Sequence, residues 1–446
     1  MKGIVNTDLN ERLQPSVNAK ISRFYQIGDI INIVDAVLGD PYDGDDLWFQ
    51  LDSGAYVWNA AVNLQQDYSL LSPEDKEQYL ISYREILGDG RPDMASKDTP
   101  ESLYFIPLRL PAVEESIRVN HLVPEFFADC VVKSVMNLEN SRKHVVLYIH
   151  GFQLSSSLKL DLLNHFVRNY MTHPNNSIAK VLFMVWPAQS LGRKTIDDRS
   201  VKAGQRFTKN NLFEGFVALS KKLKEKGKCL DLIVHSFGHQ LLNGMLNPTP
   251  DFFPNIPTDL FENVFLMAPD VTHQSVNPAG IKLFNYFKDS GGEDFQYDFS
   301  RLLTMSNNVY VFHNRYDYLL HSSTKRFVGA GNLKNPASNA GISKNYLSLG
   351  NFGSKQVDPG PVDPRFHFID VQHLVQNELP TDLTNFPFRN LDKTSSGKKI
   401  DMVLERSDYG GINLGRIVTH IGLFSNHHRY LFTSSAVVNK VISLLA

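Results

Sequence analysis

The sequence lacks the features that mark disulfide-rich, membrane-spanning or nucleic-acid-binding proteins. Only two of its 446 residues are cysteines, Cys130 and Cys229, so neither a disulfide framework nor a cysteine-based zinc motif is expected. Both are expected to be buried as small apolar residues. The 45 basic and 47 acidic residues leave a net charge of −2, which argues against nucleic acid as a partner. No run of about 18 apolar residues occurs, so no integral membrane segment is expected.

Targeting and cofactor signals are equally scarce. The N-terminal residues, MKGIVNTDLNERLQPS, lack the apolar stretch of about 7–15 residues that a secretory signal needs. Cytoplasmic residence is therefore the expectation, with signal-independent secretion as an alternative. The glycine patterns that cradle phosphates or dinucleotides are absent, so we expect no cofactor such as ATP or NAD. His150 and His235 are not accompanied by an H-E-x-x-H motif or a paired carboxylate set, so we expect no metal.

The first 63 residues predict a small all-β unit, because short apolar pieces alternate there with Gly, Pro and Asp turn signals. The pieces LNERLQPS, IGD, LWFQL and YVW resemble a bacterial Src-homology-3-like domain over residues 1–65. Such a resemblance implies a small barrel that serves as a targeting or binding module, with a peptide or a cell-wall component as ligand.

A helix and a linker are expected over residues 66–102. Within SPEDKEQYLISYREILG, Ser72 is a favourable N-cap, Pro73 occupies the first helical position and Gly88 ends the pattern. This spacing predicts one helix over residues 72–88. A polar stretch follows, and apolar pieces return at residue 103.

Residues 103–446 read as a second domain in which strands and helices alternate. Most of the expected strands are continuous apolar runs, which is typical of a sheet buried on both faces. Helical spacing of apolar residues over 158–171 and a final helical run, AVVNKVISLL, accompany them. The alternation predicts a doubly wound, mostly parallel sheet of class α/β. The expected strands cover residues 144–149, 180–186, 229–234, 263–267, 308–312 and 366–371.

Ligands of such sheets bind beyond the carboxyl ends of the strands, so the residues that follow each strand are the candidates for chemistry. The strand over 229–234 is followed by His-Ser-Phe-Gly and a helical pattern. A strand, a tight turn carrying a serine, and a helix form the geometry of a nucleophile elbow. Gly238 supplies the small residue two positions after Ser236, whereas Val234 stands where glycine is usual. The competing interpretation makes Ser236 a structural helix N-cap.

A nucleophilic serine needs a histidine base and an acid that orients it, in the chain order serine, acid, histidine. Asp317 follows a downstream strand and is the favoured acid, while Asp270 is the alternative. His428, in a late loop before the last helix, is the favoured base. Its neighbour His427 is the second candidate, and His373 is a distant third.

The oxyanion of an acyl transfer needs backbone N–H donors in place beforehand. One is expected from Phe237, directly after the serine, and the other from Phe152 in the turn after the 144–149 strand. His150 and His235 flank the serine but are expected to be hydrogen-bonded in the core. His239 is expected either to line the pocket or to face solvent.

Six sequence blocks occur in one order: LYIHGF, VWPAQSLG, LIVHSFG, VFLMAPDV, VYVFHNRYDYLL and NHHRYL. Together they resemble the blocks of a bacterial α/β-hydrolase family of unknown function, over about residues 143–445. The sequence departs from the family pattern at Val234, at Ala188 and in the doubled histidine, His427-His428. The resemblance implies an α/β-hydrolase fold with Ser236 as nucleophile, Asp317 as acid and His428 as base.

These patterns together predict a serine hydrolase, of esterase or lipase type, whose substrate is an ester, a thioester or an amide. An alternative is a non-catalytic binding or scaffolding protein that keeps the fold. A third interpretation is a lipolytic effector that the N-terminal barrel delivers to its target, with residues 321–362 and 376–415 as lids.

Overall fold

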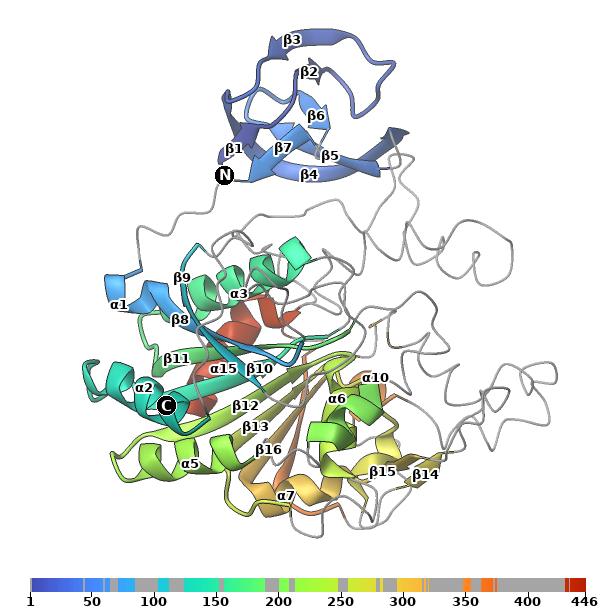
Figure 1. Cartoon of the computed structure of the whole chain (residues 1–446). Helices are drawn as coiled ribbons and strands as arrows, with labels where there is room; N and C mark the ends of the chain where they lie inside the picture. The colour runs from blue at the N-terminus through green and yellow to red at the C-terminus, as the bar shows by residue number, and fades with distance from the viewer. Residues whose placement is uncertain are drawn as a thin grey trace, which may run out of the picture. The chain divides into compact units, whose positions relative to one another are not determined.

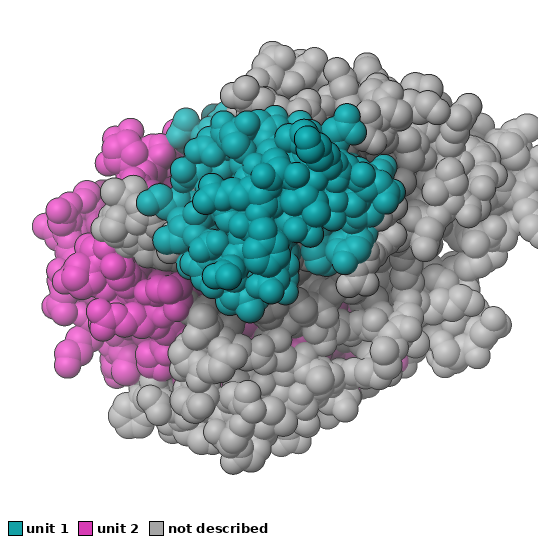
Figure 2. All heavy atoms as spheres, turned by 90° about the horizontal axis from the view of Figure 1, so that it is seen from above, with its two compact units in different colours: residues 1–70, 373–440 teal, residues 71–372, 441–446 magenta. Residues whose placement is uncertain are grey.

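The chain divides into two compact units, residues 1–70 with 373–440 and residues 71–372 with 441–446 (Figure 2). Each unit is described by itself. The computed structural model describes residues 2–42, 45–58, 61–64, 71–84, 103–111, 124–151, 156–188, 200–207, 213–247, 256–277, 281–283, 295–314, 317, 320, 348–353, 362–371, 374, 430–432 and 434–446.

The N-terminal part of the first unit is a seven-stranded antiparallel sheet in the order β3-β2-β6-β5-β4-β1-β7. Val5, Trp48 and Val57 are buried in it, as apolar residues that alternate along short strands should be. The all-β prediction is confirmed, while the Src-homology-3-like identity stays a prediction. The strands are β1 (Lys2–Val5), β2 (Leu9–Arg12), β3 (Ile21–Tyr25), β4 (Ile30–Tyr42), β5 (Asp45–Leu51), β6 (Tyr56–Trp58) and β7 (Val62–Leu64).

The second unit is built on an eight-stranded sheet in the order β17-β16-β13-β12-β10-β11-β8-β9. All neighbouring strands are parallel except β8 and β9. The six predicted strands and the mostly parallel sheet are confirmed. The strands are β8 (Glu77–Ser82), β9 (Tyr104–Arg109), β10 (His144–Ile149), β11 (Ile178–Val185), β12 (Cys229–His235), β13 (Phe261–Met267), β16 (Ser306–His313) and β17 (Phe366–Asp370).

Helices cover both faces of this sheet (Figure 1). Leu147 of β10 shares an apolar core with Val131 and Leu219, from two helices on one face. Its neighbour Tyr148 points to the other face and stacks on Phe166 at 5.3 Å between ring centroids. The helices are α1 (Pro73–Lys76), α2 (Pro124–Met136), α3 (Ser156–Met171), α5 (Phe213–Lys224), α6 (Gly238–Leu246), α7 (Leu302–Met305), α10 (Leu349–Phe352) and α15 (Ser435–Leu445).

The winding of the chain reverses between β10 and β12. From β10 the chain passes through α3 to β11 on one side, and then returns through α5 to β12 on the other side of β10. In open α/β sheets such a reversal marks the crevice that holds ligands, at the carboxyl ends of the strands. Ser236 directly follows β12, and Gly151 lies two residues beyond the end of β10.

The helix predicted over residues 72–88 ends at Lys76, and the prediction is wrong over residues 77–84. Ser72 caps a single turn, as expected, by accepting a hydrogen bond from the Asp75 N–H at 3.1 Å. The ammonium of Lys180 on β11 then bonds the carbonyl oxygens of Glu74 and Glu77, at 2.6 and 2.7 Å. These bonds allow the chain to leave the helix and pair with β11 as strand β8, so tertiary pairing overrides the local pattern.

Several smaller features complete the unit or correct expectations. Cys130 is exposed on α2 and Cys229 is partly exposed at the start of β12, so the expectation that both are buried is wrong. None of the described helices has the length and the hydropathy needed to cross a bilayer. Most of the segments expected to act as lids lie outside the described residues. An antiparallel pair, β14 (Ile281–Leu283) with β15 (Phe295–Tyr297), and the 3₁₀ turns His273–Val276 and Phe299–Arg301 complete the unit.

Candidate functional site

Ser236 occupies a strained turn between β12 and α6. Its φ angle is +51°, in the left-handed region that residues with a side chain rarely adopt. The Ser236 N–H donates to the carbonyl oxygen of Met267 on β13, at 2.9 Å, and the Ser236 carbonyl accepts from the His239 N–H at 3.1 Å. The strained conformation is therefore held from two sides, which is the arrangement of a nucleophile elbow.

The interpretation of Ser236 as a helix cap does not fit the geometry. An N-cap serine accepts a backbone N–H of the first helical turn with its side-chain oxygen. Helix α6 has Phe237 as its N-cap residue and no side-chain cap hydrogen bond. The first-turn amide of His239 bonds the backbone carbonyl of Ser236 instead of its hydroxyl. The turn thus leaves the hydroxyl of a 92% buried serine without a capping role.

Two glycines make room for this turn. A Cβ atom on Gly151 would lie 2.8 Å from the Cβ of Ser236, and one on Gly238 would lie 2.7 Å from the carbonyl oxygen of His150. Both distances are shorter than real Cβ contacts allow. Gly238 is the expected small residue two positions after the serine. Val234 is fully buried in the core, and the close approach at the elbow comes from Gly151, two residues after the end of the neighbouring strand β10.

His239 supports the elbow from inside the core. It is fully buried, and burial lowers its pKa to about 4, so the ring is neutral near pH 7. Because a carbonyl oxygen only accepts, the 2.6 Å contact between His239 Nδ1 and the Ser236 carbonyl places the proton on Nδ1. His239 does not face solvent, and its hydrogen bond fixes the backbone of the candidate nucleophile.

The two candidate acids follow strands on the same side of β12. Asp270 comes after β13, the direct neighbour of β12, and Asp317 comes after β16, one strand further. Both are buried. One carboxylate oxygen of Asp317 accepts the Leu320 N–H at 3.2 Å. The carboxyl ends of parallel strands lie on the same side of the sheet. Both carboxylates are therefore at the same strand ends as Ser236.

A hydrogen-bonded bridge ties the turn after β13 to the elbow helix. The side-chain amide of Gln240 donates to the carbonyl oxygen of Asp270 at 2.5 Å, and its oxygen accepts from the hydroxyl of Tyr297 at 2.9 Å. The sequence patterns did not identify this bridge. Gln240 follows the serine by one helical turn, which is the only local signal that it faces the same edge.

Aromatic and imidazole rings pack against the elbow. His150 lies between the rings of Phe183 and Trp186, and its Nδ1 donates to the carbonyl oxygen of Gly151 at 2.5 Å. Trp186 is fully buried and stacks on Phe237 at 6.2 Å between centroids. His150 is thus hydrogen-bonded in the core, and Trp186 acts in packing.

Several predicted site residues lie outside the described residues: Phe152, His373, His427 and His428. The described part of the predicted site therefore consists of Ser236, Phe237, Asp317 and the alternative acid Asp270.

A comparison with known protein families finds a match over the part of the chain that contains Ser236. Residues 130–333, a little under half of the sequence, match the model of a family described as alpha/beta hydrolase of unknown function (DUF900). The matched part contains the elbow and both candidate acids, whereas His428 and the N-terminal sheet lie outside it. No curated protein matches the chain.

Proposed function

We propose that the protein is a serine hydrolase that cleaves a carboxylic ester, a thioester or an amide through an acyl-enzyme on Ser236. The observation that carries the proposal is the left-handed turn at Ser236, held at the point where the sheet reverses its winding. Strain of this kind persists only where the surrounding structure enforces it, and it concentrates at functional sites. The match to a hydrolase family over residues 130–333 supports the same conclusion.

In the proposed mechanism His428 removes the proton of the Ser236 hydroxyl while the oxygen attacks the substrate carbonyl carbon. The N–H groups of Phe237 and Phe152 stabilise the oxyanion. His428 then gives its proton to the leaving group as the bond to the acyl carbon breaks. Water, deprotonated by the same histidine, attacks the acyl-enzyme and regenerates the Ser236 hydroxyl.

The carboxylate of Asp317 holds the imidazole in the correct tautomer and stabilises its charged form. The burial of Asp317 and its turn-forming hydrogen bond to Leu320 support this role, since an acid of a triad needs a fixed orientation. Asp270 is the alternative acid because its strand is the direct neighbour of β12.

A fluorophosphonate probe tests the proposal, since it reacts with an activated serine. The full chain should be labelled, and Ser236→Ala should abolish labelling and lower ester turnover by a factor on the order of 10⁶. Ser134→Ala, on helix α2, is the matched control and should be labelled like the wild type. Labelling should decline below about pH 6.5 as the base becomes protonated. Equal labelling of wild type and Ser236→Ala would reject the proposal and favour the non-catalytic alternative.

A panel of p-nitrophenyl esters of rising acyl length distinguishes the esterase from the lipase interpretation. Preference for short chains indicates an esterase, and preference for long chains indicates the lipolytic effector.

For the N-terminal unit we propose a targeting or binding role. Among the described residues, most of the exposed large apolar side chains belong to it, and such side chains mark binding sites where they form a continuous patch. Co-sedimentation of the full chain with insoluble peptidoglycan, compared with Phe24→Ser, tests a cell-wall ligand. These exposed residues of the unit are Leu13, Ile21, Phe24, Ile27, Ile30, Val34 and Tyr42.

A further inference from the structure

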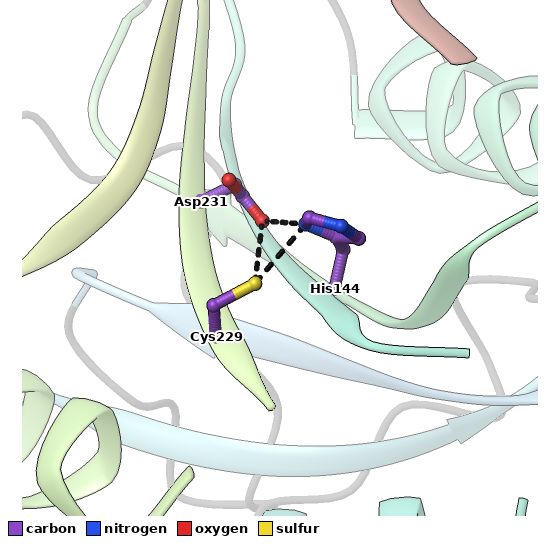
Figure 3. A group of neighbouring side chains, drawn as sticks. All are labelled: His144, Cys229 and Asp231. Carbon is purple, nitrogen blue, oxygen red and sulfur yellow. Dashed lines mark hydrogen bonds and ion pairs between the residues drawn. The ribbon is translucent and has the colours of Figure 1, made fainter. Parts of the chain in front are cut away.

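A second group of reactive side chains lies at the other end of the same strands, away from Ser236. His144 begins β10, and Cys229 and Asp231 lie at the start of β12. The parallel register pairs His144 with Cys229 and Val146 with Asp231. Because side chains alternate along a strand, all three of these side chains project from one face. Figure 3 shows them pointing toward one another.

The donor atoms of the three residues converge. The Nδ1 atom of His144 lies 2.7 Å from a carboxylate oxygen of Asp231 and 3.1 Å from the sulfur of Cys229. The sulfur lies 3.7 Å from the same oxygen. The nitrogen, the sulfur and the oxygen are thus about as close to one another as the ligand atoms of one metal ion.

This group is not a cysteine-histidine-aspartate relay. In such a relay the imidazole contacts the nucleophile with one ring nitrogen and the acid with the other. Here Nδ1 of His144 faces both partners. The convergence on one point needs another explanation.

We propose that His144, Cys229 and Asp231 bind a divalent transition-metal ion at the amino-terminal ends of β10 and β12. The chemistry of the three ligands favours zinc. Imidazole, thiolate and carboxylate are the ligands that zinc takes in proteins, whereas magnesium and calcium prefer oxygen alone. A thiolate and a carboxylate together balance the two positive charges of the ion. The partial exposure of Cys229 admits water to a fourth position.

The spacing fits tetrahedral coordination after a small adjustment. Zinc bonds of about 2.0–2.3 Å separate neighbouring ligand atoms by about 3.4–3.7 Å. The distance between sulfur and carboxylate oxygen already matches. The distances from His144 Nδ1 to the carboxylate oxygen and to the sulfur must each open by about half an ångström.

The surroundings hold the carboxylate in a ligating orientation. The second oxygen of Asp231 accepts both the backbone N–H and the side-chain amide of Asn263, at 3.0 and 2.9 Å. Asn263 in turn accepts from Asn308 at 3.3 Å. Such outer partners orient metal ligands in proteins. The nearby ammonium of Lys228 is engaged with the carbonyl oxygens of Glu139 and Arg142.

Cobalt(II) titration of the chelator-treated full chain tests the site. Wild type should bind one equivalent and develop a thiolate-to-cobalt charge-transfer band, which zinc should remove by displacement. Cys229→Ser should lose the band and weaken zinc binding by at least about 100-fold. Cys130→Ser is the matched control, because it removes the only other cysteine and should leave the band intact.

Two further variants separate this site from other interpretations. Asn263→Ala should weaken zinc binding by about 10–100-fold while keeping the charge-transfer band. Ser236→Ala should bind metal like the wild type. The test of metal binding is therefore independent of the test of hydrolysis. A wild type without the band, a band that survives in Cys229→Ser, or a band lost in Cys130→Ser would each overturn the proposal. The wild type and the control decide the question even where another variant fails to fold.

Discussion

The imidazole of His239 donates from Nδ1 to the carbonyl oxygen of Ser236, three residues earlier in the chain, at 2.6 Å. A buried neutral ring is thereby tied to the backbone of the one strained serine at the sheet edge. Burial lowers the pKa of this imidazole to about 4, far below the usual value for histidine.

This relationship predicts a loss of stability in mild acid. The unfolded chain takes up a proton at His239 below about pH 6.5, whereas the folded protein does so only near pH 4. Between these values the unfolded state binds more protons, so the free energy of unfolding falls as the pH falls. His239 alone should account for a loss of about 2 kcal/mol between pH 7.5 and pH 5.

Urea unfolding at several pH values measures this contribution. In His239→Asn, whose amide retains a donor without a titrating group, the dependence on pH should be flatter by that amount. His367→Asn removes an exposed histidine of β17 and should unfold like the wild type across the same range. Identical pH profiles for wild type and His239→Asn would contradict the assignment.

A second prediction concerns the space beside the serine. In Gly151→Ala the new methyl group would collide with the Cβ of Ser236, so the hydroxyl must shift or the turn must open. A displacement of about 1 Å lowers catalysis by about 10²-fold, and the rate of labelling by a fluorophosphonate should fall accordingly.

Gly227→Ala serves as the control for this change. Its Cβ would meet no neighbour, but its φ angle of +67° strains any residue with a side chain. It should therefore lose about 1 kcal/mol of stability and keep the wild-type labelling rate. An unchanged rate in Gly151→Ala would show that the close approach at the elbow does not position the hydroxyl.

A third prediction decides between the candidate acids. Asp317→Asn should lower turnover by about 10⁴-fold, because the amide holds the imidazole in the wrong tautomer. Asp270→Asn should keep turnover within about tenfold of the wild type, since the bond from Gln240 goes to the Asp270 backbone. Steady-state kinetics on the same ester measures both. The reverse pattern would assign the acid to Asp270.

The parallel core of the sheet was predictable because its signal is local. Strands such as β10 and β12 are continuous apolar runs, and Ser236 with Gly238 sits in a recognisable turn. These features follow from the residues that build them, without reference to distant segments.

Other features depend on residues that meet only after folding. The pattern over 72–88 has a good helix start, but pairing with β11 and the bonds from Lys180 turn residues 77–82 into a strand. His144 and Cys229 are 85 positions apart, and only the pairing of β10 with β12 joins them. Neither outcome is readable from spacing along the chain.

The last prediction tests why β8 is a strand. The buried ammonium of Lys180 satisfies the carbonyl oxygens of Glu74 and Glu77. Lys180→Met keeps the length of the side chain and removes the charged donor, so the Glu77 carbonyl loses this hydrogen bond and the Glu74 carbonyl keeps only its bond from the Glu77 N–H. Each such loss costs about 1–3 kcal/mol, so the free energy of unfolding in urea should fall by about 2 kcal/mol or more.

Lys221→Met, on the exposed side of α5, is the control, and its free energy of unfolding should stay within about 0.5 kcal/mol of the wild type. Equal stability of the two variants would mean that strand pairing alone, without the bonds from Lys180, ends the helix at Lys76.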